Sequence, residues 1–267
     1  MIKRKDIKRI GQFENKLLED ALAIEEPLEI SIKKESEIDS TKISVTMRTP
    51  GQDGFLALGF LFTEGILDKF SDVVSVGEFV ENEVFITIKD RAKVNLSQID
   101  RNFYTTSSCG VCGKSSIESI QTISSFDIDS YGLRIKKEVL FQLPEALLDH
   151  QLAFNETGGI HAAALFTNEG ELISYHEDVG RHNALDKVIG EAFSKGELPM
   201  YDKVLLLSGR ASFELIQKAG MAGIPVVASI GAPSSLAVEL AEEQAMTLVG
   251  FLKSDRFNLY SRYERIQ

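Results

Sequence analysis

The second half of the chain alternates short apolar runs with amphipathic segments, and this alternation restricts the possible folds more than any other feature. Residues 204–207 and 226–230 are too short and too apolar for anything but strands buried on both faces. Apolar residues at helical spacing follow each run. Strands and helices in this order predict an α/β lobe with helices on both faces of a sheet.

The flanking segments complete this lobe. Residues 160–166 and 171–176 read as a strand pair joined by a polar turn, and a helix with an apolar face follows the segment 178–183. We expect Pro144 in the first turn of another helix, because proline lacks the N–H that a helix start leaves unpaired. A last helix is predicted over residues 234–246.

The first half predicts a smaller α+β lobe. Strands are expected at residues 27–33 and 42–48, and a second strand pair at 73–79 and 84–89. Between the pairs, apolar residues at helical spacing predict a helix over residues 52–64 that ends at the glycine of position 65. The expected division is an N-terminal lobe of residues 1–125 and a second lobe of residues 126–267.

Both cysteines of the chain, Cys109 and Cys112, lie in one segment rich in glycine and serine. This composition predicts a flexible loop that presents the thiols. The spacing of Ser115 and Glu118 is that of a capping box and predicts a helix start just after the loop. A helix N-terminus favours the thiolate, which is the reactive form of cysteine, so we interpret the loop as a site of sulfur chemistry.

Three other interpretations of the Cys-x-x-Cys pair stay open at this point. It could be half of a structural zinc site, a thioredoxin-like disulfide couple, or two unconnected free thiols. A zinc site within one chain needs four ligands, and the histidines form no second pair at short spacing: His150, His161, His176 and His182.

Composition excludes several classes of protein. A formal net charge of −11 argues against general binding to nucleic acid or to an anionic membrane surface. The basic start is not followed by an apolar run, so no signal peptide is expected, and residues 54–62 are too few to span a bilayer. We therefore expect a cytoplasmic protein with reduced thiols.

Two strand-to-helix junctions, residues 208–210 and 231–235, are candidate ligand sites, because helix starts bind phosphate and Arg210 adds a charged fork. A third candidate follows the last expected helix and mixes an aromatic ring with two cations, which suits a nucleobase and a phosphate. Its residues are Phe251, Leu252, Lys253, Ser254, Asp255 and Arg256. Each candidate has an ordinary alternative, a surface turn.

His182 lies near an expected helix start, in an order of elements that resembles the zinc nucleoside deaminases. Those enzymes need His-x-Glu and Pro-Cys-x-x-Cys, whereas Asn183 and Ala184 follow His182 and residues 208–212 contain no cysteine. The lobe therefore resembles the deaminase fold without its catalytic set, and no catalytic metal is expected. His182 is either a ligand-pocket donor or a histidine paired at a helix start.

Taken together, these segments resemble the FdhD family, the formate dehydrogenase accessory sulfurtransferases. The blocks that carry the resemblance are residues 108–113, 157–161, 177–184, 208–210 and 250–256. The resemblance implies a cytoplasmic, dimeric sulfur carrier with a cytidine-deaminase-like fold. It also implies a persulfide on Cys109, a cysteine desulfurase as sulfur donor, and a cofactor site lined by residues 251–256.

By the same resemblance, the acceptor is the molybdenum cofactor in its bis-guanine-dinucleotide form, before insertion into formate dehydrogenase. A guanine nucleotide such as GDP is then expected to bind as a fragment of that cofactor, with Arg210 and His182 contributing to the pocket. The alternative function is a non-catalytic Cys-x-x-Cys module that binds zinc or is redox-active and also binds a nucleotide.

Overall fold

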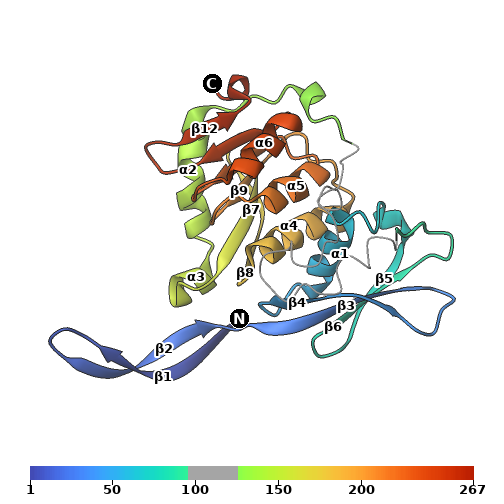
Figure 1. The fold of residues 1–267 in the computed structure, drawn as a ribbon, viewed down its shortest axis with the longest axis horizontal. Helices are drawn as coiled ribbons and strands as arrows, with labels where there is room; N and C mark the ends of the chain where they lie inside the picture. Colours follow the sequence, from blue (N-terminus) through green and yellow to red (C-terminus); the bar gives the residue numbers. More distant parts are fainter. Residues whose placement is uncertain (96–125) are drawn as a thin grey trace.

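The structure, a computed structural model, describes residues 1–95 and 126–267 (Figure 1). Its largest element is a six-stranded mixed sheet in the order β12-β11-β10-β9-β7-β8. Strands β9, β10 and β11 run parallel, and β7, β8 and β12 pair antiparallel with their neighbours. The strands are β7 (His161–Thr167), β8 (Leu172–Asp178), β9 (Lys203–Leu207), β10 (Val226–Ser229), β11 (Thr247–Gly250) and β12 (Asn258–Ser261).

Helices cover both faces of this sheet, as predicted. Helix α2 lies along one face, and α4, α5 and α6 lie on the other (Figure 1). Alternate residues of one strand belong to different cores: Leu205 packs in the cluster on the α4 side, and Leu206 packs in the cluster on the α2 side. The helices are α2 (Lys137–Leu148), α3 (Leu152–Thr157), α4 (Arg181–Lys195), α5 (Phe213–Met221) and α6 (Ser235–Glu243). The sequence-based α/β assignment with three layers is therefore confirmed.

A second sheet, in the order β4-β3-β6-β5, forms from the first part of the chain. Helix α1 (Asp53–Thr63) packs its buried residues with those of this sheet in one apolar cluster. The strands are β3 (Glu26–Lys34), β4 (Thr41–Arg48), β5 (Val73–Val80) and β6 (Glu83–Ile88). The four predicted strands and the helix are thus confirmed, and Gly65 follows the helix with φ 68°, as its expected role requires.

Helices α1 and α4 join the two sheets through an unusually close contact. A Cβ on Gly59 would overlap the carbonyl oxygen of Asp186, and a Cβ on Gly190 would overlap that of Phe55. Because only glycine fits at these two points, the helix backbones approach each other directly. One apolar cluster therefore contains residues of both halves, such as Ile30 of β3 and Leu185 of α4. The division at residue 125 stays a prediction.

Two sequence-based expectations were wrong. Pro144 lies in the interior of α2, not in its first turn, because Leu140, Leu143 and Leu147 anchor one continuous helix in the core. Tertiary packing there outweighs the loss of one N–H donor. Helix α6 ends at Glu243 and not at residue 246, and strand β11 follows it, so the loop of residues 251–256 comes after a strand and not directly after the last helix.

The chain also begins with a hairpin that the sequence did not predict. Strands β1 (Ile2–Ile10) and β2 (Asn15–Ala23) pair only with each other among the described residues and project from the body (Figure 1). In the part of the chain that the structure describes, no helix is both long and apolar enough to cross a bilayer.

Candidate functional site

The candidate ligand loops meet at the carboxyl ends of the parallel strands. The Gly231 N–H donates to the carbonyl oxygen of Gly209 at 3.0 Å, and the Phe251 N–H donates to the carbonyl oxygen of Gly231 at 3.0 Å. Gly231 is required here, because a Cβ would lie 2.9 Å from the backbone nitrogen of Arg210. These contacts place the loop of Arg210 beside the loop that begins at Phe251. The carboxyl edge of a parallel sheet is where ligands bind in open α/β folds.

The loop of residues 251–256 connects β11 to β12, and its side chains divide between the core and the solvent. Leu252 is 1% exposed and packs in the cluster on the α2 side, so it anchors the loop. Phe251 is 44% exposed and holds the left-handed φ of 53°. The Lys253 N–H donates to the Arg256 carbonyl at 2.9 Å and closes the turn, leaving both cationic side chains exposed.

Two residues of this loop pair with each other at the surface. The Arg256 guanidinium lies 3.3 Å from Asp255, and both side chains are about two-thirds exposed. Ser254 is exposed beside them. Such a pair is weak in water, so Arg256 is free to exchange Asp255 for an anionic ligand.

His182 connects the starts of two helices. Its Nε2 lies 2.8 Å from Glu214 Oε2 and 3.4 Å from Ser212 Oγ, so α4 and α5 are linked at their first turns. A paired histidine at a helix start was one of the two interpretations from sequence. No group of three or more His, Cys, Asp and Glu side chains that could hold a metal occurs in the described ranges.

Two basic residues near His182, namely His161 and Arg181, were not singled out as site residues from the sequence. His161 lies against Gly209, where a Cβ would be 3.2 Å from its Nδ1. Burial lowers the pKa of His161, the nearby Arg181 and Arg210 lower it further, and Asp178 opposes them. Two arginine side chains therefore lie near His161 at the carboxyl edge of the sheet. The sequence signal was present in the pair Gly158-Gly159 just before the histidine, but a lone histidine at a strand start is weak evidence.

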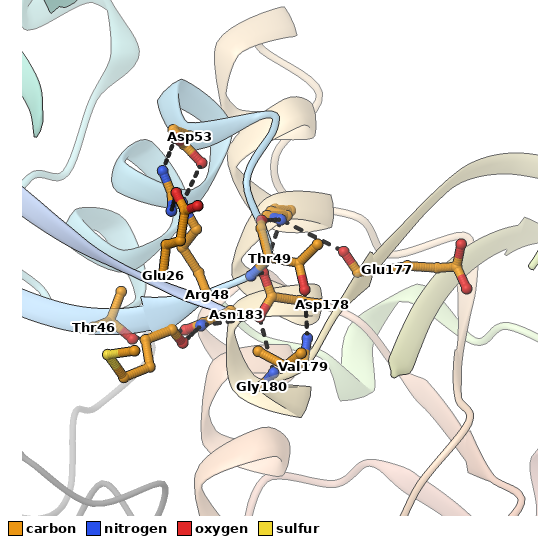
Figure 2. Close-up of polar contacts among 12 residues, drawn as sticks. Glu26, Thr46, Arg48, Thr49, Asp53, Glu177, Asp178, Val179, Gly180 and Asn183 are labelled. Carbon is orange, nitrogen blue, oxygen red and sulfur yellow. Dashed lines mark hydrogen bonds and ion pairs between the residues drawn. The ribbon is translucent and has the colours of Figure 1, made fainter. Parts of the chain in front are cut away.

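A buried ion pair holds this corner in place. Asp178 and Lys187 are both fully buried, and their carboxylate oxygen and ammonium nitrogen are 2.8 Å apart. Asp178 also accepts hydrogen bonds from the Gly180 N–H at 2.8 Å and the Thr49 N–H at 3.1 Å (Figure 2). Burial raises the pKa of Asp178, and Lys187, the Gly180 N–H and the Asn183 amide oppose that effect.

The same network reaches into the N-terminal half. Lys187 donates to the Thr49 carbonyl at 2.9 Å, and the Asn183 amide donates to the Met47 carbonyl at 2.8 Å. Figure 2 shows Thr49 and Asn183 converging on Asp178 from different elements. Residues 177–184, a sequence block typical of a site, therefore fix the start of α4 against the end of β4.

The sulfur residues cannot be placed on this framework. Cys109, Cys112 and the helix start expected at residues 115–118 all lie outside the described residues. The assignment of the persulfide to Cys109 and of the ligand to residues 251–256, Arg210 and His182 stays a prediction. The described part brings the expected ligand loops together at one edge of the sheet.

Comparison with known proteins finds a matching family and named relatives. The model of the FdhD/NarQ family matches residues 23–267. A relative from Streptomyces coelicolor, named sulfur carrier protein FdhD, is 46% identical over 92% of this chain and 89% of its own length. A relative of the same name from Mycolicibacterium paratuberculosis is 48% identical over 92% of each chain.

A solved structure supports the fold. The crystal structure of a candidate formate dehydrogenase accessory protein from Desulfotalea psychrophila superposes with a TM-score of 0.79 at 24% identity. The superposition covers 100% of this chain and 99% of that chain.

The Asp178–Lys187 pair leads to a stability prediction. Lys187→Met leaves a buried carboxylate without its counterion, so we expect a loss of about 3–5 kcal/mol in the free energy of unfolding, measured by urea denaturation. The pKa of Asp178 is already raised, and losing Lys187 raises it further. A carboxyl whose pKa is raised in the folded state destabilises the fold as pH rises. The difference in free energy of unfolding between the parent protein and Lys187→Met should therefore become smaller as pH is lowered from about 7 to about 5.

The matched control is Lys195→Met, on the exposed end of the same helix, where Lys195 pairs with Glu191 at 2.7 Å. It should cost less than about 1 kcal/mol. A similarly small, pH-independent loss in Lys187→Met would show that the buried pair does not hold this corner.

Proposed function

The chain belongs to the FdhD/NarQ family, and on that premise we propose that it is a sulfur carrier for formate dehydrogenase. It accepts persulfide sulfur from a cysteine desulfurase and passes it to the molybdenum cofactor in its bis-guanine-dinucleotide form. The cofactor is then inserted into formate dehydrogenase, whose activity depends on this transfer. We place the protein in the cytoplasm, as a homodimer.

The proposal rests on one agreement: the relatives are named as sulfur carriers, and this chain has cysteines that can carry sulfur. Relatives 42–48% identical are named sulfur carrier proteins, and this chain has only Cys109 and Cys112 as sulfur nucleophiles. A cysteine thiolate that attacks the outer sulfur of a desulfurase persulfide takes that sulfur and releases the desulfurase thiolate. The reaction exchanges one S–S bond for another, so it needs no oxidant.

Delivery from Cys109 can use the second cysteine. The Cys112 thiolate attacks the inner sulfur of the Cys109 persulfide, forms a disulfide and releases the terminal sulfur as hydrosulfide to the acceptor. A dithiol reductant then restores both thiols for the next cycle. A carrier in the reducing cytoplasm has such reductants available.

The described edge of the sheet suits the proposed acceptor, which carries pyrophosphates and guanines. The exposed ring of Phe251 offers a stacking surface, and Lys253 and Arg256 offer cations in the same turn. The positive charges of Arg181 and Arg210, which lie near His161, add attraction for an anion. In a chain of net charge −11, such a local group of cations is what a pyrophosphate requires.

Sulfur loading tests the proposal. After incubation with a cysteine desulfurase and cysteine, intact-mass spectrometry should show a gain of at least one sulfur atom that a reductant removes. Cys109→Ala should abolish the gain, and the matched control Cys112→Ala should retain it, because only Cys109 is assigned as the acceptor.

Full loading and full dehydrogenase maturation in Cys109→Ala would overturn the assignment. Stoichiometric zinc that depends on both cysteines, with no sulfur gain, would favour a zinc-binding module instead.

Nucleotide binding tests the acceptor site separately. Losing one charge-assisted phosphate contact costs about 1.5–3 kcal/mol, so Arg256→Ala should weaken GDP binding by roughly tenfold or more in titration calorimetry. Cys109→Ala and Arg91→Ala, which removes an exposed arginine elsewhere, should leave the affinity nearly unchanged. Equal affinities in the parent protein and Arg256→Ala would show that residues 251–256 are an ordinary surface turn.

A further inference from the structure

The N-terminal hairpin, residues 2–23 and here called the arm, lies almost entirely outside the part of the chain that the family model matches. It projects from the body as two strands (Figure 1), with no third strand beside it among the described residues. At its base, Arg4 forms an ion pair with Glu156 of α3 at 3.0 Å. A two-stranded ribbon is marginally stable in water when nothing covers it.

The register of the arm sorts its side chains onto two unlike faces. Directly paired residues share a face, and the face alternates along each strand. The first face carries Arg4 and Lys8 together with Asp6 and Glu19, so its charges balance. The opposite face, here called the basic face, consists of Lys3, Lys5, Ile7, Arg9, Lys16, Leu18, Asp20 and Leu22.

The basic face combines an apolar centre with a surplus of cations. Ile7 is directly paired with Leu18, and the 42% exposed Leu22 extends the apolar strip. Four Lys and Arg side chains surround the strip, against a single acid, Asp20. This composition matches a protein-docking surface, in which an apolar centre is buried and charges at the rim select the partner.

One pair on this face points to an anionic partner. Arg9 and Lys16 are directly opposite each other, and like charges in that position destabilise a ribbon. Lys16 also contacts Glu14 at 2.6 Å, but no ion pair of Arg9 occurs in the described parts of the chain. A carboxylate from another surface would relieve the repulsion.

Further apolar side chains are exposed toward the tip of the arm. The relative exposures are 68% for Ile10, 92% for Phe13 and 85% for Leu17. Large aliphatic and aromatic groups at such exposure favour contact with a protein.

The rest of the same chain supplies the complementary charge. Residues 1–24 hold six Lys and Arg against four Asp and Glu, whereas the other 243 residues hold 23 against 36. The arm is therefore positive and the body strongly negative. In a two-fold dimer each arm would meet the body of the other copy, so the attraction would occur twice.

We propose that the basic face of the arm docks on the body of a second copy of this chain. This deepens the homodimer of the proposed function by naming the surface that forms it. The docking does not depend on sulfur transfer, so the loading experiment and the experiment below can fail independently. Nucleic acid and anionic membrane are less suitable partners, because the body would be repelled from both.

The test is the dimer dissociation constant, measured by sedimentation equilibrium. Arg9→Glu places an acid opposite Lys16, which favours the ribbon itself while reversing the charge offered to the partner. Because the change occurs twice per dimer, the dissociation constant should rise by about tenfold. Raising ionic strength from about 0.05 to about 0.5 M should weaken the parent dimer more than the variant dimer.

Lys8→Glu is the matched control, since Lys8 is exposed on the same strand but on the opposite face. Its dissociation constant should stay within about twofold of the parent value. A parent protein that is monomeric at every concentration, an unchanged constant in Arg9→Glu, or an equal effect of Lys8→Glu would each overturn the proposal.

Discussion

The buried ion pair between Asp178 and Lys187 is the interaction on which the arrangement of this protein depends. It joins the end of β8 to α4 and, through Thr49, to the junction of β4 and α1. A buried pair gives little net stability by itself, but losing one partner leaves an uncompensated charge. The pair therefore enforces one relative position of the two sheets, and the start of α4, with Arg181 and His182, is held against the carboxyl edge of the main sheet.

The parts of the fold that follow from hydrophobic patterning were predictable from the sequence. The runs that became β9 and β10 had to be buried on both faces, and the structure places them between two apolar clusters. The failures have local causes. Pro144 was assigned by its own preference for a helix start, whereas packing of α2 decided the outcome. Strand β1 was not predicted because five of its nine residues are Lys or Arg, which favour strands only weakly.

The candidate site was predictable in its residues but not in its assembly. Arg210 and Phe251 were recognised as separate ligand loops, and Gly231 joins them through two backbone hydrogen bonds that no spacing rule indicates. Arg181 and His161 were not singled out because the importance of each depends on the residues that lie beside it in the fold. Leu252 belongs to the same block as Arg256, yet burial gives it a packing role. A sequence block thus mixes residues that touch a ligand with residues that position them.

Transfer of the sulfur itself tests the central claim most directly. The protein would be loaded by a cysteine desulfurase with ³⁵S-cysteine, separated from the desulfurase, and mixed with formate dehydrogenase carrying unsulfurated molybdenum cofactor. The account predicts that the label leaves the protein, appears with the cofactor and is accompanied by a gain of formate oxidation. Label that stays on the protein, or escapes as free sulfide while the dehydrogenase remains inactive, would contradict it.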